Sequence, residues 1–239
     1  MNHHDYYHFQ AKARQVFSLG DVERYGRQAG QLYRQMVSRW LPDDHASPIA
    51  ELACGHGSFL WWLCSCGYSQ VCGVDSSSGQ IDLARQVEGV TVVHADVNLW
   101  LERQPVGSWQ TIIAIDLIEH LTKDDLMIFL AGANRVLRPG GRLILRYPNG
   151  DSPLVGVNLF NDITHVWTYT ANCLASLSKM HGFSQAEFAD ESTAAICKHR
   201  WLKVPLSRLS QAVLGAFIWA ASKTKPISWS PNLWACLVK

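Results

Sequence analysis

Glu51-Leu-Ala-Cys-Gly-His-Gly57 is the segment of this 239-residue chain that decides its fold. It ends a short apolar run at 49–53 and precedes residues 58–66, whose apolar pattern predicts a helix closed by Gly67. Gly55 and Gly57 allow a positive φ and a close backbone approach to a ligand, and the helix that follows offers free N–H groups. A tight turn from strand to helix needs glycine in any case, so this segment alone leaves ligand binding open.

Strands and helices alternate along the chain on both sides of this segment. The predicted strands are 49–53, 71–74, 90–94, 111–115, 142–147, 186–189 and 233–238, and the predicted helices are 21–40, 58–66, 78–87, 122–137, 170–181 and 206–221. Continuous apolar strands separated by helices indicate an α/β fold with a doubly wound, mostly parallel sheet covered on both faces. We expect the first five strands to be parallel and the last hairpin to be reversed. Asp21, Thr122 and Thr170 are the expected N-caps.

Composition limits the classes of protein that remain. Apolar residues make up 48% of the chain, which is enough for a core, while 21 Lys+Arg against 20 Asp+Glu leave a net charge of +1. That balance argues against nucleic-acid binding by bulk electrostatics. The N-terminus shows no signal-peptide pattern, and the seven cysteines lack zinc-like spacing, so we expect a cytoplasmic protein with reduced thiols. The longest uncharged apolar run, 212–221, is shorter than the ~20 residues of a membrane span.

Acidic residues follow the first four predicted strands. Glu51 and Asp75 end the first two strands, and Asp96 and Asp116 follow the next two. Ligands of such sheets bind beyond the carboxyl ends of the strands, where a carboxylate can accept both hydroxyls of a ribose. A dinucleotide dehydrogenase would carry a third glycine where this chain has Leu60, which disfavours that class.

Residues 45–190 resemble the class I S-adenosylmethionine-dependent methyltransferases. The matching segments are Glu51–Gly57, Val74-Asp75, His94-Ala-Asp96-Val97, Asp116-Leu-Ile-Glu-His120-Leu and Leu137-Arg-Pro-Gly-Gly141. The resemblance implies a seven-stranded, Rossmann-like methyltransferase fold in a single domain. Its parts would be an N-terminal helical cap (1–47), a cofactor-binding core (48–190), and a helical insertion with the last strand (191–239). S-adenosyl-L-methionine would be the cofactor and S-adenosyl-L-homocysteine the product.

The resemblance also assigns roles to matching residues. Gly55 and Gly57 would approach the methionine and ribose portion of the cofactor, and Asp75 would hold the ribose hydroxyls. Asp96 would bind the adenine amino group, and the backbone of Asp116-Leu117 would lie near the sulfonium. Ala53 stands where the family's first motif often has a glycine. The expected cofactor-binding set is Glu51, Ala53, Gly55, His56, Gly57, Asp75, Ser76, Asp96, Val97, Asp116 and Leu117.

The sequence indicates the molecule that accepts the methyl group less clearly than it indicates the cofactor. The Asn/Asp-Pro-Pro-aromatic motif of exocyclic-amine methyltransferases is missing after strand four, which disfavours that chemistry. The long loop at 149–169 carries Asn161-Asp-Ile-Thr-His165, which resembles a stretch of bacterial methyltransferases of glycan biosynthesis. His165 is the first candidate for general base and His120 the second, because an imidazole pKa near 6.5 suits proton abstraction. Both histidines can instead be structural. We expect O-methylation of a sugar, a glycan precursor or a similar small metabolite.

Basic and aromatic residues gather in the C-terminal segment 198–225. This pattern suits an interfacial helix on an anionic membrane or a lipid-linked substrate, and equally a helical cap that packs on the core. The location would then be the cytoplasm, at the inner face of the membrane if this segment binds lipid. An RNA methyltransferase and a non-catalytic scaffold with the same fold remain as alternatives, and the oligomeric state stays open. We expect the N-terminal helix to cover the pocket, with Tyr6, Tyr7, Phe9 and Phe17 as lid residues.

Overall fold

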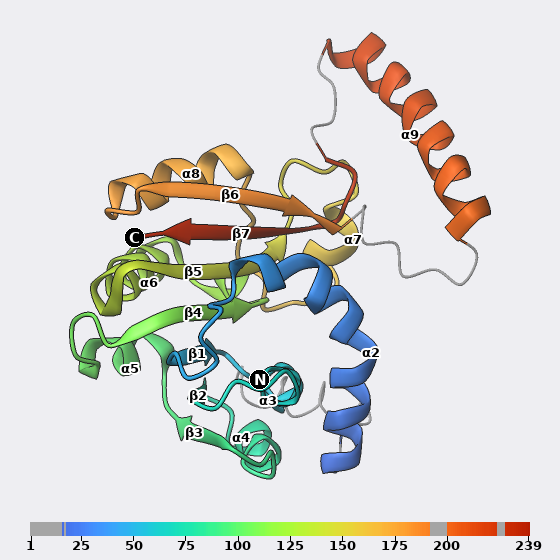
Figure 1. Ribbon diagram of the computed structural model, residues 1–239. Coiled ribbons are helices and arrows are strands. Elements are labelled where there is room, and N and C mark those ends of the chain that lie inside the picture. The colour runs from blue at the N-terminus through green and yellow to red at the C-terminus, as the bar shows by residue number, and fades with distance from the viewer. Residues whose placement is uncertain (1–15, 17, 192–199, 224–227) are drawn as a thin grey trace.

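A seven-stranded sheet in the order β3-β2-β1-β4-β5-β7-β6 forms the centre of the computed structural model, which describes residues 16, 18–191, 200–223 and 228–239 (Figure 1). The strands are β1 Ile49–Leu52, β2 Val71–Asp75, β3 Val90–His94, β4 Trp109–Ile115, β5 Leu137–Pro148, β6 Gln185–Asp190 and β7 Asn232–Val238. Strands β1 to β5 pair in parallel, which confirms the doubly wound prediction.

The last two strands differ in one respect from the expected reversed hairpin. β7 inserts between β5 and β6 and is antiparallel to both. Because β6 pairs only with the reversed β7 at the sheet edge, β6 itself runs in the same direction as β5. Only β7 is therefore reversed among the described strands.

Helices cover both faces of this sheet. The helices of the described residues are α2 Leu19–Val37, η1 Ser38–Trp40, α3 Ser58–Ser65, α4 Ser78–Ala84, α5 Val97–Arg103, η2 Ile118–His120, α6 Lys123–Val136, α7 Gly156–Leu159, α8 Ala171–Met180 and α9 Arg200–Ser222. The apolar core on one face joins the sheet to α5, α6 and α8, and the core on the other face joins it to α2, α3 and α4. The buried apolar runs of the strands are thus covered from both sides, as parallel strands require.

The helix starts follow their capping chemistry. Thr122 and Thr170 are the N-caps of α6 and α8, as predicted. The prediction for Asp21 is wrong, because Ser18 caps α2 and its hydroxyl accepts the N–H of Asp21, which lies in the first turn. An acidic residue in that turn still favours the helix through its dipole.

Two residues with a left-handed backbone lie at the carboxyl edge of the sheet. Ala53, after β1, has φ 59°, and Asp116, after β4, has φ 54°. This conformation costs an L-residue roughly 1–2 kcal/mol, and such strain concentrates at functional sites. Ala53 therefore has a backbone conformation that glycine adopts without this cost.

Helix α9 projects away from the body of the molecule (Figure 1). Its segment Val204–Ser222 is 19 residues long, none of it is buried, and by length and composition alone it is apolar enough to cross a membrane. The apolar helix is thus longer than the run at 212–221, and it does not pack on the core as a cap would. The expected lid residues Tyr6, Tyr7, Phe9 and Phe17 lie outside the described residues. Helix α2 lines a cavity at the carboxyl edge of the sheet through Tyr25, Ala29 and Tyr33.

Candidate functional site

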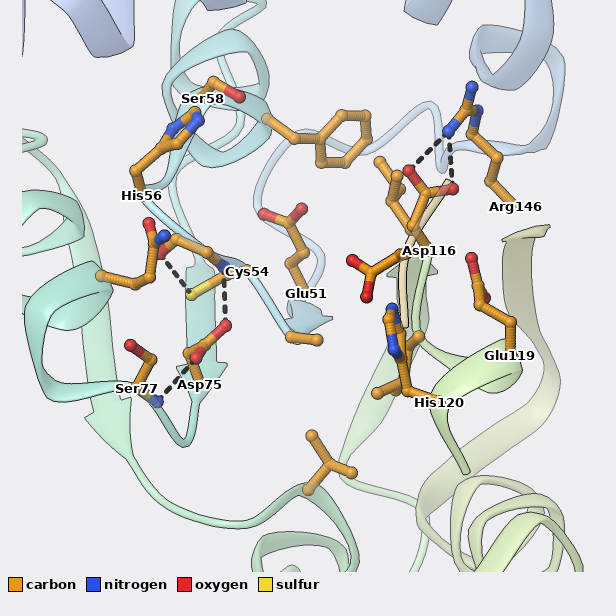
Figure 2. Close-up of a pocket in the computed structure, with 18 of the residues that line it drawn as sticks. Glu51, Cys54, His56, Ser58, Asp75, Ser77, Asp116, Glu119, His120 and Arg146 are labelled. Atoms are coloured by element: carbon orange, nitrogen blue, oxygen red, sulfur yellow. Dashed lines mark hydrogen bonds and ion pairs between the residues drawn. The ribbon is translucent and has the colours of Figure 1, made fainter. Parts of the chain in front are cut away.

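A cavity of about 900 Å³ lies at the carboxyl edge of the sheet. All four acids predicted at the strand ends, Glu51, Asp75, Asp96 and Asp116, line its wall. Figure 2 shows the carboxyl groups of Glu51, Asp75 and Asp116 along this edge, with His120 and Glu119 beyond Asp116. The parallel register places these groups together, because neighbouring strands end at the same level.

Asp75 fixes the glycine loop against the end of β2. Its carboxylate accepts the backbone N–H of Gly55 at 2.8 Å through Oδ2 and that of Ser77 at 2.8 Å through Oδ1. Burial raises its pKa, and these two N–H groups act in the opposite direction. A carboxylate has about four acceptor positions, so Asp75 keeps capacity for two further donors such as the hydroxyls of a ribose.

Glu51 presents a buried oxygen that lacks a donor. The residue is 3% exposed, and its Oε2 has no hydrogen-bond partner among the described residues. Burial, with Asp75 as a second cause, raises the pKa of Glu51 well above its usual value. An orphaned buried acceptor on a cavity wall is a position for a ligand donor, and an ammonium group would satisfy it.

One glycine of the predicted cofactor-binding set does not line the cavity. Ten of the eleven expected cofactor-binding residues line the wall: Glu51, Ala53, Gly55, His56, Asp75, Ser76, Asp96, Val97, Asp116 and Leu117. Gly57 is not among the described wall residues. It precedes α3 with φ 85°, and a Cβ there would lie 3.1 Å from the Cα of Ala84 on α4, so its glycine serves the turn and close packing. Asp96 also caps α5, accepting two N–H groups through Oδ1.

An arginine that sequence reasoning missed closes the rim beside Asp116. Arg146 on β5 donates Nη1 to both oxygens of Asp116 at 2.6 Å, and its Nε donates to Oε1 of Glu191 at 2.6 Å. The flanking carboxylates raise the pKa of Arg146 against the opposing effect of its burial. An arginine near the carboxyl end of the predicted strand 142–147, directly after three apolar residues, was the signal that could have identified this residue.

The two candidate bases, predicted separately, come together on the cavity wall. The ring centroids of His120 and His165 are 4.6 Å apart. The loop that carries His165 is attached to η2 by the Val166 N–H, which donates to the Glu119 carbonyl at 2.7 Å. A pair of adjacent imidazoles therefore faces the same space as Asp116 and Leu117.

Their hydrogen bonds decide which ring nitrogen carries the proton. Nδ1 of His165 lies 2.9 Å from the Leu159 carbonyl, which can only accept, so Nδ1 carries the hydrogen. Thr164 Oγ1 donates its proton to Asp162 at 2.6 Å and therefore accepts from Nδ1 of His120 at 2.9 Å. In the neutral form both rings thus have an unprotonated Nε2. Burial, and next the neighbouring His165, lower the pKa of His120 and favour this neutral form.

The buried carboxyl of Glu51 predicts a pH-dependent gain in stability. We expect Glu51→Gln to melt at least about 2–4 °C higher than the unchanged protein at pH 8, equivalent to roughly 1 kcal/mol, and the gain to shrink toward pH 5. Because the pKa of Glu51 is raised in the folded state, its carboxyl group contributes stability that is fully present below the pKa of the unfolded chain. This stability is lost as the pH rises through the folded-state pKa. Glutamine has no carboxyl proton to lose.

Thermal unfolding between pH 5 and pH 8 measures this gain. The matched control is Glu88→Gln, at an exposed glutamate, which should leave the melting temperature within about 1 °C at every pH. A difference between Glu51→Gln and the unchanged protein that stays constant over this range would contradict the argument.

Relatives with known names share part of this chain. Residues 49–141 match the family model described as a methyltransferase domain. Over 182 residues the chain is 24% identical to a tRNA U34 carboxymethyltransferase of Idiomarina loihiensis, covering 70% of this chain and 54% of that protein. The chain thus spans about half the length of this curated relative.

Solved structures extend the likeness to nearly the whole chain. A SAM-dependent methyltransferase of Archaeoglobus fulgidus superposes with a TM-score of 0.68 at 17% identity, covering 98% of this chain and 99% of that one. Phosphoethanolamine N-methyltransferase 2 of Haemonchus contortus, in complex with S-adenosyl-L-methionine, gives 0.60 at 15% identity, covering 94% of this chain and 60% of that one. At these identities the likeness shows the fold.

The segment that matches the methyltransferase domain contains the glycine loop and all four acids of the cavity rim. The seven-stranded sheet with its reversed β7 has the architecture that the resemblance implied. Residues 49–141 are therefore a methyltransferase domain, and the fold around them is that of the class I S-adenosylmethionine-dependent methyltransferases.

Proposed function

We propose that this chain methylates a hydroxyl oxygen of a sugar, a glycan precursor or a similar small metabolite. The observation that carries the proposal is the pair of imidazoles on the cavity wall, each with Nδ1 committed to a hydrogen bond and Nε2 unprotonated. A hydroxyl acceptor must lose its proton as the new bond to carbon forms, and a positioned neutral imidazole can take it.

The cavity wall fits the family's cofactor. Asp75 retains acceptor capacity for the ribose hydroxyls, the orphaned Glu51 oxygen suits the ammonium group, and Asp96 suits the adenine amino group. The bound cofactor supplies an electrophilic methyl group on a sulfonium. The protein's part is to align the acceptor in line with that methyl group. About 900 Å³ is near the upper end of small-molecule pockets, which leaves room for a small acceptor beside the cofactor.

Asp75→Ala is expected to weaken S-adenosylmethionine binding by about 10- to 100-fold. The substitution removes a charged acceptor for the ribose and frees the Gly55 and Ser77 N–H groups that hold the loop. Hydrogen bonds to a charged group contribute roughly 1.5–3 kcal/mol each, which sets this range.

Calorimetry with S-adenosylmethionine measures the loss. Asp82→Ala, on the exposed face of α4, is the matched control and should bind like the unchanged protein. Equal affinity in Asp75→Ala and Asp82→Ala would remove the ribose role from Asp75.

The acceptor class is tested with S-adenosylmethionine labelled on its methyl group. The protein is incubated with a cell extract, which is then separated into glycan, lipid, small-metabolite, RNA and protein fractions. Label in glycan, lipid-linked glycan or small metabolites supports the proposal. Label in RNA, with steeply salt-dependent RNA binding, would establish an RNA methyltransferase instead. Cofactor binding without label in any fraction would indicate a non-catalytic scaffold.

We also infer that α9 contacts an anionic membrane surface, which would place a cytoplasmic chain at the inner face of the membrane. The helix exposes Leu206, Leu209, Val213, Leu214, Phe217 and Trp219. Arg208 lies in the first half of the helix and Lys223 directly follows its last residue, and the sequence from 200 to 223 contains no acidic residue. Exposed apolar side chains together with bases suit a lipid interface with negative charge, and a lipid-linked acceptor would be found there.

Co-sedimentation of the full chain with vesicles tests this contact. We expect binding to vesicles of phosphatidylglycerol, weaker binding to phosphatidylcholine, and loss of both in Leu209→Glu/Phe217→Glu. Val106→Glu, at an exposed apolar residue outside α9, is the control and should bind normally. Equal binding by both variants, or self-association through α9 without vesicle binding, would overturn the inference.

A further inference from the structure

Three residues whose side chains can bind a metal ion lie together on the wall of the cavity. One potential ligand atom from each of Glu119, His120 and His165 lies within 4.8 Å of the other two. All three residues line the cavity, and Figure 2 shows the Glu119 and His120 side chains beside Asp116. Two imidazoles and one carboxylate are a ligand set that suits transition metals and zinc rather than magnesium or calcium.

The hydrogen bonds behind the two imidazoles hold them as metal ligands are held. Metal-binding histidines usually donate the second ring N–H to a carbonyl or carboxylate, which fixes the ring and leaves the other nitrogen for the metal. Here Nδ1 of His165 donates to the Leu159 carbonyl, and Nδ1 of His120 donates to Thr164, which itself donates to Asp162. In each neutral ring Nε2 is therefore the unprotonated nitrogen.

Glu119 supplies an independent observation. It is 1% exposed, and its Oε2 has no hydrogen-bond partner within the described parts of the chain. Leaving a buried polar group unsatisfied costs roughly 1–3 kcal/mol, and more for a charged one. Its backbone carbonyl, in contrast, accepts Val166 N–H at 2.7 Å, so the residue is fixed in place. A bound cation would provide the missing partner of this carboxyl group.

We propose that Glu119, His120 and His165 bind one divalent transition-metal or zinc ion. Three protein ligands leave a coordination position open toward the cavity, as in catalytic metal sites. That position would accept the acceptor's hydroxyl oxygen and lower its pKa. The O–H bond would break with its proton passing to water, and the O–C bond would form as the S–C bond breaks. This consequence rests on the proposed O-methylation, whereas metal binding does not.

Cobalt(II) is the probe for the site. The full chain is treated with chelator, dialysed and titrated with Co²⁺ while the visible spectrum and the bound metal are measured. We expect one Co²⁺ site, competed by Zn²⁺, that is lost in Glu119→Gln and in His165→Gln. His45→Gln, at an exposed histidine outside the cavity, is the control and should keep the site. S-adenosylmethionine binding by each variant verifies its fold.

The result separates this inference from the proposed function, because the titration contains no acceptor. Identical spectra and stoichiometry in all four proteins, or no ordered Co²⁺ site in the unchanged protein, would overturn the metal site. Once an acceptor is known, methyl transfer that stops on chelation and returns with metal, in the unchanged protein but not in His165→Gln, would support its catalytic part. Transfer that continues undiminished after chelation would overturn that part and leave direct proton abstraction.

Discussion

Arg146→Met is expected to lower the free energy of unfolding by about 3–5 kcal/mol, the range for removing one partner of a buried ion pair. The Arg146 side chain is 18% exposed and bonds both Asp116 and Glu191. Without the guanidinium, Glu191, 16% exposed, remains largely buried and has lost its ion-pair partner. Among the described residues its remaining donors are neutral: the Trp234 indole N–H at 2.8 Å and the Asn232 amide at 3.3 Å.

Urea unfolding measures the loss. Arg85→Met is the matched control, because Arg85 pairs with Asp82 at 3.4 Å on the surface and should cost less than about 1 kcal/mol. Adding Glu191→Gln to Arg146→Met should recover part of the loss, since it removes the uncompensated charge. Similar losses in Arg146→Met and Arg85→Met, or no recovery in the double variant, would show that the buried network contributes little.

The fold could be predicted because the strands and most of the helices each have a recognisable pattern within a few consecutive residues. The parallel strands are continuous apolar runs, and β3 was predicted with its observed bounds, 90–94. Helix α6 has its own N-cap, Thr122, and ends shortly before Pro139-Gly-Gly141, which cannot continue a helix. Helix α7 was missed because four residues are too short to show a helical period, and α5 was missed because its start at Asp96-Val97 was interpreted as part of the cofactor-binding segment. Asp96 was assigned to a ligand, although the same residue also begins α5.

The site was only partly predictable for a related reason. Acids that directly follow strands must share one edge, so their convergence follows from the sequence pattern. The path of the loop at 149–169 does not, because contacts remote in sequence set it. Asn149 bonds Ser228 and the Ser230 carbonyl, and the loop backbone bonds Glu119. The pairing of His120 with His165, and of Arg146 with Glu191, therefore appears only in three dimensions.

His165→Asn and His120→Asn are each expected to lower kcat by about 10²–10⁴-fold at saturating cofactor, the range for losing a positioned acid–base group. Asparagine is polar and of similar size but lacks a basic nitrogen. His181→Asn is the control, since His181 follows α8 and contacts Met127 outside the described cavity wall. Unchanged S-adenosylmethionine affinity would show that the loss lies in the transfer step. If neither variant loses 10²-fold, oriented binding alone accounts for the reaction.

The double variant His120→Asn/His165→Asn then shows how the two rings divide the work. Residues that act as one unit are strongly non-additive, so removing the second costs little once the first is gone. A shared metal ion, or a proton passed between two rings whose centroids are 4.6 Å apart, predicts a double variant no slower than the slower single one. Losses that multiply would mean independent roles, one ring acting on the acceptor and the other holding the loop. Multiplied losses would also contradict the three-residue metal site, because removing either imidazole should already abolish it.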